Sequence, residues 1–316
     1  MRVRVIDLDG SITSQDRLLR MVQPDVYDLR SWGPRLRMAC RWASYYRFER
    51  RLDRLLRADD EREPSAHFLG SGDFHHITLA LLRRVQQPFN LLVLDKHPDW
   101  MRGVPFLHCG TWLHHAAKLP NVRRIFHVGG DMDFDNAYRW LAPTSQLRAG
   151  KIVTLPATRT FHTGFWRDLP HQSLRACPDM PVDRDRLEDL LSPYLDDLDR
   201  LPLYVSLDKD VMWMPESVVN WDSGSLELSE VQEIVQFFMK AASNDLIGMD
   251  IVGDWSHVQT QGWIRQLLHR YEHPKQVIDA DEARLSNERT NLMLLRFLHN
   301  DSAVERRAVP SRLRIA

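Results

Sequence analysis

A short stretch of the chain carries acidic and imidazole side chains at a spacing that suits metal chemistry. The apolar run Leu91–Leu94 leads into Asp95, His97 and Asp99, which stand at positions i, i+2 and i+4. On an extended chain these three side chains emerge on one face. Pro98 ends hydrogen bonding to a neighbouring strand, so the triplet is predicted to lie where a strand becomes a loop.

A second stretch repeats this arrangement. The apolar run Leu203–Leu207 ends in Asp208 and Asp210, which again share a face. Four carboxylates and an imidazole that converge from strand ends would repel one another unless cations lay between them. The two stretches therefore predict a metal site, and the number of oxygen ligands indicates more than one ion.

Ligand-type residues also follow two further predicted strands. His75 and His76 come after a glycine loop, and Asp250 and Asp254 flank the end of the last strand. Oxygen-rich ligation with imidazoles favours manganese or magnesium over a thiolate-type zinc site. Two such ions about 3.5–4 Å apart would lower the pKa of a shared water and direct it at an electrophilic carbon.

These residues require strands that end at one common edge. Apolar runs predict strands at residues 3–8, 67–69, 91–94, 122–128, 152–155, 203–207 and 246–252. Helical patterns cover residues 36–56, 77–85, 111–118, 136–141, 184–198 and 283–299, with a kink at Pro193, and a helix capped by Ser229 and Gln232. The alternation predicts an α/β fold with a mostly parallel central sheet, helices on both faces, and sites beyond the carboxyl ends of the strands.

The chain shows no internal repeat and no break in composition that would require a second domain. We expect one α/β domain over residues 1–300, an Arg- and Trp-rich helical insertion at 15–60, and a polar basic tail at 301–316 that is poorly ordered. The first interpretation of the insertion is an amphipathic helix with a solvated basic face. Binding of an acidic partner is the alternative.

Composition excludes several classes of protein. The 316 residues are 43% hydrophobic and carry a net charge of −1, which argues against nucleic acid as the main partner. Cys40, Cys109 and Cys177 are odd in number and widely spaced, so no disulfide framework is expected. No stretch reaches membrane-spanning length, and the first residues are interpreted as a strand rather than a leader. We expect a cytoplasmic protein without a membrane partner, and homo-oligomerisation stays open.

The order of these motifs resembles that of the ureohydrolase family, which contains arginase and agmatinase, from roughly Leu69 to Trp255. Gly72–Leu82 is similar to the family's GGDHSITLPLL-type segment, Asp95–Asp99 to its DAHxD motif, Leu107–Gly110 to the segment with its catalytic histidine, Ser206–Asp210 to SxDxD, and Gly248–Val252 to its final core strand. The resemblance implies a three-layer arginase-like fold. It also implies hydrolysis of a guanidino group to urea and a primary amine.

The resemblance further implies roles for single residues. One manganese ion would be bound by His75, Asp95, Asp99 and Asp208, and a second by Asp95, His97, Asp208 and Asp210, so that Asp95 and Asp208 bridge the two. Asp99 would also hold the bridging hydroxide by a hydrogen bond, and His108 would give a proton to the departing amine. A guanidinium is a poor electrophile, so hydrolysis needs both an activated hydroxide and a nearby proton donor.

Departures from the family pattern bear on the substrate. The family's guanidinium-binding glutamate aligns with Gly253, and Asp254 is the nearby carboxylate that could bind substrate instead. The loop Trp100–Leu107 lacks the Asn and Ser groups with which arginases hold a free amino acid. The chain therefore resembles the divergent branch of peptide arginases, which convert arginine side chains in a peptide to ornithine. Lys96 and Lys209, inside the two metal motifs, are predicted to point away from the ligands and to pair with acids.

Other functions remain open at this stage. The absence of the glutamate favours a second hypothesis, an amide hydrolase of the deacetylase type. A metal-binding interaction protein without turnover is the third hypothesis. Asp7-Leu8-Asp9-Gly10, with Asp131 and Asp135, matches the acidic motifs of haloacid-dehalogenase-like phosphatases and is interpreted as a chance match. Trp100, Trp213, Trp221 and Trp255 lie near predicted strand ends, where they either pack in the core or line a substrate cleft.

Overall fold

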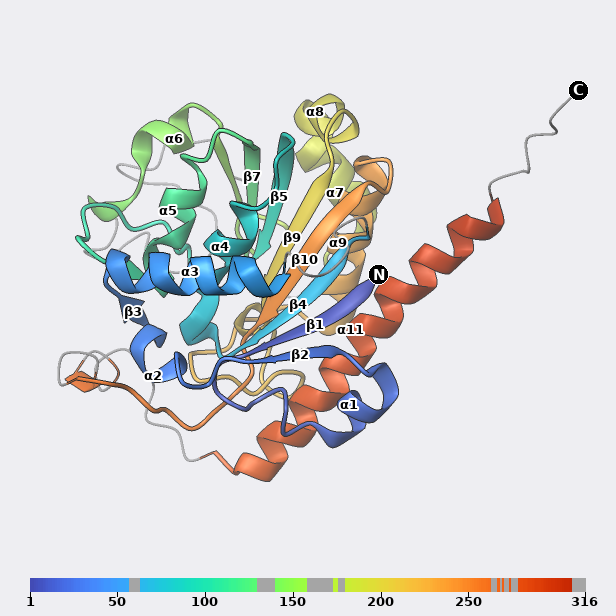
Figure 1. The fold of residues 1–316 in the computed structure, drawn as a ribbon. Coiled ribbons are helices and arrows are strands. Elements are labelled where there is room, and N and C mark those ends of the chain that lie inside the picture. The colour runs from blue at the N-terminus through green and yellow to red at the C-terminus, as the bar shows by residue number, and fades with distance from the viewer. Residues whose placement is uncertain are drawn as a thin grey trace, which may run out of the picture.

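The fold is built on a central parallel sheet. The structure is a computed structural model that describes residues 1–56, 63–129, 140–157, 173–175, 180–262, 266–267, 269, 273 and 278–308. Within these residues eight parallel strands follow the order β2-β1-β4-β10-β9-β5-β7-β8 (Figure 1). They are β1 (Arg2–Asp7), β2 (Asp25–Asp28), β4 (Ser65–Gly70), β5 (Phe89–Leu94), β7 (Val122–Val128), β8 (Ile152–Leu155), β9 (Leu203–Asp208) and β10 (Leu246–Val252). A short antiparallel pair, β3 (Ala39–Cys40) and β6 (Leu107–His108), stands apart from this sheet.

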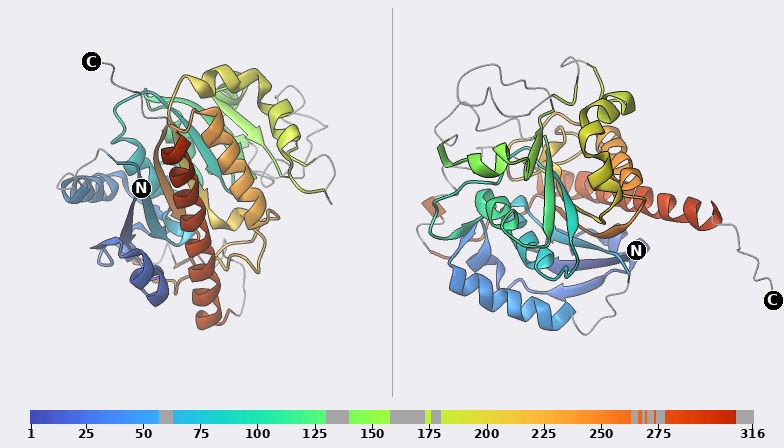
Figure 2. Two further views of the ribbon diagram at one scale, coloured as in Figure 1. Left: turned by 90° about the vertical axis from the view of Figure 1, so that its right-hand side faces the viewer. Right: turned by 90° about the horizontal axis from the view of Figure 1, so that it is seen from above.

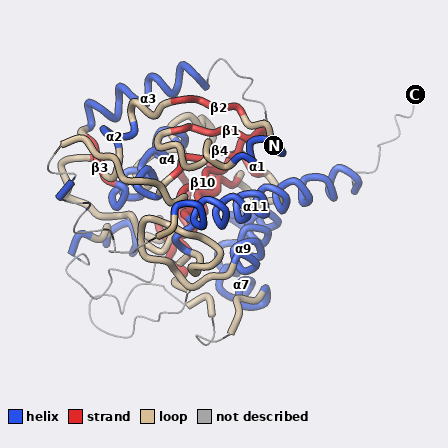
Figure 3. Tube along the Cα trace, turned by 90° about the horizontal axis from the view of Figure 1, so that it is seen from below, coloured by secondary structure: helices blue, strands red, loops and turns tan. Residues whose placement is uncertain are grey.

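Helices cover both faces of the sheet. They are α1 (Asp16–Val22), α2 (Gly33–Leu36), α3 (Trp42–Leu56), α4 (Thr78–Leu82), α5 (Trp112–Ala116), α6 (Thr144–Arg148), α7 (Arg184–Leu191), α8 (Leu195–Asp199), α9 (Leu228–Ala241) and α11 (Ala280–Ala308). Figure 2 shows α9 and α11 together on one side of the sheet and α3 on the other. The tube in Figure 3, seen from below, places α3 and α2 along one outer edge and α11, α9 and α7 along the other. The predicted three-layer α/β arrangement is therefore confirmed.

The alternation of side chains along the central strands explains the two layers. Leu92 and Leu94 of β5 belong to the core cluster that contains α9 and α11, whereas Leu91 and Val93 belong to the cluster that contains α3, α4 and α5. A strand that is buried on both faces is largely apolar. This explains why β5 and β9 are mostly hydrophobic, and the buried polar residues Asn90 and Ser206 within them are hydrogen-bonded.

The structure corrects several predicted element boundaries. The segment 184–198 is two helices, α7 and α8, joined by a 3-10 turn at Ser192–Tyr194 that contains Pro193. The predicted cap at Ser229 is wrong. The helix α9 starts one residue earlier, because Glu227 and Glu230 exchange hydrogen bonds as a capping box. The last helix extends from Ala280 to Ala308 and projects beyond the body of the molecule (Figure 1).

Some expectations fall on parts of the chain that the structure does not describe. They are the helix start at 136–139, the acidic residues Asp131 and Asp135, the end of the helical insertion at 57–60, Cys177 and the last eight residues. Cys40 and Cys109 are buried and are not joined by a disulfide. In the described ranges, no helix combines the length and the apolar character that crossing a membrane would require.

Candidate metal centre

The candidate centre lies where two neighbouring strands end. β5 and β9 are adjacent and parallel, with Leu94 opposite Leu207, so the segments that follow leave the sheet side by side. Asp95 comes directly after β5 and Asp208 is the last residue of β9. Asp210 lies in the 3-10 helix η6 (Lys209–Val211). The parallel register thus brings together carboxylates that are far apart in the sequence.

His75 lies among three of these carboxylates. It is fully buried in the 3-10 helix η1 (Gly72–Ile77). Its Nδ1 atom is 3.0 Å from Asp95 Oδ2, 3.2 Å from Asp99 Oδ2 and 3.5 Å from Asp208 Oδ2. Within the described residues, neither His75 Nδ1 nor Asp95 Oδ2 makes a hydrogen bond of good geometry. These are buried atoms that coordination to a metal would satisfy.

A second group surrounds His97. The Nδ1 atom of His97 lies 2.7 Å from Asp210 Oδ2 and 3.8 Å from Asp95 Oδ1. The ligand atoms of Asp95, His97 and Asp210 lie within 4.8 Å of one another, as do those of His75, Asp95 and Asp99. Asp95 belongs to both groups, which is the arrangement expected of a bridging ligand. Donor type, burial and spacing therefore fit two neighbouring metal ions.

The pKa values of the clustered carboxylates and of His97 also favour a metal site. Burial raises the pKa of Asp95, and the charges of Asp99 and Asp210 raise it further. Burial, together with the charge of Asp210, raises the pKa of Asp208 to about 8. Although burial disfavours a charged imidazole, the Asp210 carboxylate raises the pKa of His97 to about 10. Carboxylates held this closely repel one another, and divalent cations between them would remove that repulsion.

A chain of hydrogen bonds orients His75 from behind. Its Nε2 lies 3.0 Å from Ser206 Oγ, and Ser206 donates to Asp250 Oδ1 at 2.9 Å. Thr78 donates to the same oxygen at 2.8 Å. With Nε2 donating to Ser206, Nδ1 carries the lone pair that faces the carboxylates. Asp250, a candidate from its place at a strand end, thus supports a ligand-type residue rather than joining the group.

Asp99 and His108 are held together by the start of α5. Trp112 Nε1 donates to Asp99 Oδ2 at 2.7 Å, and the backbone N–H of Leu113 donates to the Asp99 carbonyl at 2.9 Å. The preceding residues form the 3-10 turn capped by His108, whose Nδ1 accepts the N–H of Gly110 at 2.9 Å. A neutral His108 therefore carries its proton on Nε2. No motif marks Trp112, and sequence reasoning missed it.

Asp254 lies away from the candidate metal ligands, and the predicted contact between Asp254 and the substrate is therefore wrong. Its carboxylate is buried, with Oδ2 2.9 Å from Lys209 Nζ. Its Oδ1 accepts hydrogen bonds from Gln15 at 2.7 Å and from Asn291 at 3.1 Å. With these three partners, the Asp254 carboxylate stabilises the fold and is not available to bind a substrate. The prediction that Lys209 points away from the ligands and pairs with an acid agrees with this contact.

The position of the family's glutamate cannot carry a side chain here. Gly253 has φ +92°, and a Cβ atom on it would lie 2.5 Å from Asp208 Oδ1 and 2.7 Å from the backbone nitrogen of Lys209. The left-handed backbone and the close approach both require glycine. The missing glutamate is therefore a consequence of how the segment after β10 packs against the end of β9.

A second polar cluster adjoins His97, and of its members only Trp221 was a candidate from the sequence. The Trp221 ring lies 5.4 Å from the His97 ring, and its Nε1 donates to Asp73 Oδ1 at 3.1 Å. Asp73 also contacts His273 Nε2 at 2.8 Å and Arg37 Nη1 at 3.1 Å. Although burial disfavours its charge, His273 and Arg37 hold the pKa of Asp73 below its usual range.

The two aspartates of the phosphatase-like motif are used in local structure. Asp7 accepts hydrogen bonds from Gly10 N at 2.8 Å and Thr13 Oγ1 at 2.9 Å. Asp9 Oδ2 accepts from Arg37 Nη2 at 3.0 Å and from Ser256 Oγ at 2.7 Å. Asp7 therefore closes the turn after β1, and Asp9 ties that turn to the C-cap of α2 and to the segment after β10.

Comparison with solved structures identifies the fold class as arginase-like. Arginase from Entamoeba histolytica, solved in complex with L-ornithine, superimposes with a TM-score of 0.52 at 12% identity, over 91% of this chain and 97% of that one. Arginase from Bacillus subtilis gives a TM-score of 0.50 at 15% identity, over 94% and 98% of the two chains. Formimidoylglutamase from Bacillus subtilis gives 0.50 at 12%, over 92% and 86%.

Sequence comparison adds a distant relative of undescribed activity. An uncharacterized protein of Thermotoga maritima is 25% identical over 187 residues, which are 59% of this chain and 57% of that protein. The match thus spans little more than half of the relative's length. No protein-family model matches the chain. The likeness to solved structures at these identities establishes the arginase-like fold.

Proposed function

We propose that this protein is a hydrolase of guanidino groups that works with two manganese ions. The proposed ligands are His75, Asp95, Asp99 and Asp208 for one ion, and Asp95, His97, Asp208 and Asp210 for the other. The observation that supports this most directly is the pair of ligand groups that share Asp95 at the adjoining ends of β5 and β9. In line with the three widely spaced cysteines of the sequence, we propose a cytoplasmic location.

The chain's own residues have distinct tasks in this proposal. When bound, the two ions would lower the pKa of a shared water so that it attacks the guanidinium carbon. Asp99 is kept in place by Trp112 and offers its remaining lone pairs to that water. His108 would give its Nε2 proton to the departing amine from the imidazolium form, and because that form also carries a proton on Nδ1, the hydrogen bond from Gly110 N–H is released when the ring is charged. The products are urea and a primary amine.

The substrate must be held without the family's glutamate. Position 253 excludes a side chain and Asp254 is paired, so the cation has to be received by other groups near the centre. We assign this role to the half-buried Trp221, beside His97, because an aromatic face attracts a guanidinium and the carboxylates provide a negative field.

We further propose that the guanidino group belongs to an arginine within a peptide, which becomes ornithine. The loop Trp100–Leu107 offers few polar side chains to a free amino acid's charged α-groups. A peptide presents those groups as neutral amides. An amide hydrolase of the deacetylase type is the second candidate, because it would not need a carboxylate at position 253.

The test measures urea and acetate release by the purified protein loaded with manganese. We expect urea and an ornithine residue from an arginine-containing peptide, little urea from free arginine, and no acetate from an acetyl-lysine peptide. His108→Asn should bind manganese normally and lose most of the rate, about 10²–10⁴-fold for a missing proton donor. Faster turnover of free arginine would refute the peptide assignment. Acetate without urea would replace the guanidino reaction by the amide one.

A further inference from the structure

Helix α3 carries a row of exposed arginines. Its apolar face, formed by Tyr45, Phe48, Leu52 and Leu56, is buried. On the opposite face Arg47, Arg50, Arg51 and Arg54 are exposed. Their positions are i, i+3, i+4 and i+7, which places all four guanidinium groups on one side of the helix. We call these four residues the arginine stripe.

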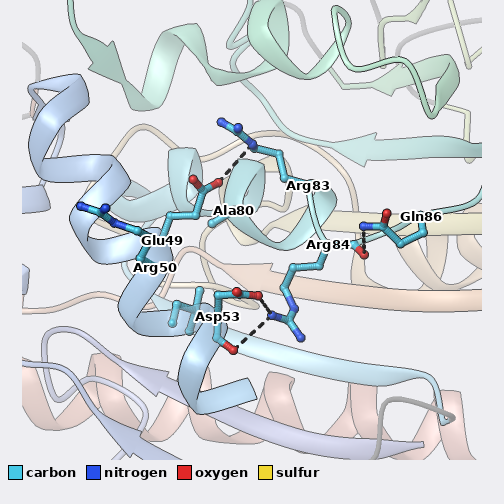
Figure 4. A pocket seen from close by; sticks show the side chains of 8 residues that line it. Glu49, Arg50, Asp53, Ala80, Arg83, Arg84 and Gln86 are labelled. Atoms are coloured by element: carbon cyan, nitrogen blue, oxygen red, sulfur yellow. Dashed lines mark hydrogen bonds and ion pairs between the residues drawn. The ribbon is translucent and has the colours of Figure 1, made fainter. Parts of the chain in front are cut away.

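The acidic residues of α3 do not neutralise the stripe. Glu49 and Asp53 turn toward the next helix and pair with Arg83 and Arg84, with 3.2 Å between Arg83 Nε and Glu49 Oε1 (Figure 4). These pairs line a hollow of about 370 Å³ between α3 and the end of α4. Among the described carboxylates, none lies within ion-pair distance of a stripe arginine.

Such a stripe works against the stability of its own helix. Like charges three and four residues apart on a helix repel each other, and the stripe contains Arg47/Arg50, Arg47/Arg51, Arg50/Arg54 and Arg51/Arg54 pairs. The whole chain carries a net charge of −1, so the excess of positive charge on this face is a local feature and not a property of the chain as a whole. A surface of this kind is complementary to an anionic partner.

The stripe starts close to the candidate centre. β3, which leads directly into α3, pairs with β6 through Ala39 opposite His108. Trp42, the first residue of α3, lies 4.7 Å from the ring of His115 in α5. With a rise of 1.5 Å per residue, Arg54 is about 18 Å further along the helix than Trp42. Helix α3, which carries the stripe, therefore leads away from β3 and its partner segment with His108 along the outside of the molecule (Figure 1).

We propose that the arginine stripe is a docking surface for an acidic segment of the peptide substrate, at a distance from the arginine that is hydrolysed. This proposal rests on the peptide substrate proposed above. Guanidinium groups bind carboxylates through paired hydrogen bonds. One row of side chains matches a single extended chain, whereas duplex nucleic acid or a membrane surface is contacted by a broader basic area.

The test compares two peptides with the same arginine and a spacer of about 4 to 12 residues, ending in either a run of glutamates or a run of glutamines. An exposed ion pair contributes a factor of about 1.5 to 5 in affinity. We expect the glutamate peptide to have a KM about tenfold lower, with kcat unchanged and the advantage lost at high salt. The variant R47E/R51E should abolish the difference between the two peptides.

Two controls make the test specific. R289E/R296E reverses two exposed arginines on α11 and changes the net charge equally, and it should keep the preference for glutamate. A lysine-tailed peptide should regain the lower KM with R47E/R51E. Equal KM values for the glutamate and glutamine peptides with the native protein would overturn the docking surface. Binding of single-stranded DNA or anionic vesicles through the stripe, without binding of the glutamate peptide, would do the same.

A binding experiment tests the docking surface independently of the proposed function. Binding of a fluorescent glutamate peptide is measured by anisotropy with the variant Asp95→Asn, which needs no turnover. If the peptide binds and R47E/R51E removes binding, the stripe recognises acidic peptides even where no urea is released. If urea is released from both peptides alike and the anisotropy stays flat, the proposed function holds and the docking surface is wrong.

Discussion

Removal of Lys209 should destabilise the fold far more than removal of the whole ion pair to which it belongs. Lys209 Nζ and Asp254 Oδ2 are 2.9 Å apart and their side chains are 0% and 1% exposed. Lys209 also donates to Asn287 of α11 at 3.0 Å. In the variant Lys209→Met, Asp254 keeps only its hydrogen bonds from Gln15 and Asn291 and remains as a buried charge without a counter-ion.

The expected size follows from this burial. Removing one partner of a buried pair costs about 3–5 kcal/mol because it leaves an uncompensated charge, whereas replacing both by apolar groups is often near neutral. We therefore expect Lys209→Met and Asp254→Leu each to lower the free energy of unfolding by about 3–5 kcal/mol. The double variant should lose less than either single one. The amides of Gln15 and Asn291 would then lose their acceptor, at about 1–3 kcal/mol.

The assay is urea unfolding of the metal-free protein, followed by tryptophan fluorescence, for the native chain, both single variants and the double variant. Metal-free protein is used because Lys209 stands between Asp208 and Asp210, and bound metal would add its own stabilisation. Losses below about 1 kcal/mol for the single variants would mean that water reaches the pair and that it is screened. Strictly additive losses would mean that Lys209 and Asp254 do not interact, and either result refutes the reasoning.

Three further predictions concern the centre itself. Asp95→Asn should reduce binding of both manganese ions, because Asp95 belongs to both ligand groups, and calorimetry should find the stoichiometry and affinity lowered together. The pKa values of Asp208 (about 8) and His97 (about 10) lie above the unfolded values, so the folded chain holds these protons more tightly. The stability that these two groups contribute to the metal-free protein should then be lost as pH rises from about 4 to about 10, measured as the difference in Tm between the native chain and an Asp208→Asn/His97→Asn variant, and a difference that grows with pH would contradict it. Gly253→Ala would place a Cβ 2.5 Å from Asp208 Oδ1, so we expect about 10–100-fold weaker metal binding, and unchanged binding would show that the segment can move.

Much of the site could be predicted because strand geometry relates sequence spacing to direction. Asp95, His97 and Asp99 follow one another at intervals of two residues, and Asp208 ends a second apolar run. Parallel strands end at a common edge, so two such motifs must approach each other if their strands are neighbours. The sequence could not show that β9 lies directly between β10 and β5, which is what places Asp208 against His75.

The parts that could not be predicted depend on contacts without any periodic pattern. Trp112 reaches Asp99, and Arg37 reaches Asp73, because loops fold back over the sheet edge. The short strand β3 pairs with β6 although about seventy residues separate them along the chain. No propensity or motif encodes a partner at that distance. The structural role of Asp254 could not be predicted for the same reason, since its partners Gln15 and Asn291 come from opposite ends of the sequence.

Lys96 and Lys209, the two lysines inside the metal motifs, show that side chains at a strand end alternate between the metal centre and the opposite side. Residues at i and i+2 face the centre, so the residue between them must face away. Lys96 donates from Nζ to the Ser223 carbonyl at 2.8 Å, and Lys209 pairs with Asp254. Each ligand-bearing turn is thus fastened from behind, one to the loop before α9 and the other to the segment after β10. Because a lysine amine can make such bonds only when its stem crosses the packed layer, a small residue at either position would leave the carboxylates on that turn less firmly placed for metal binding.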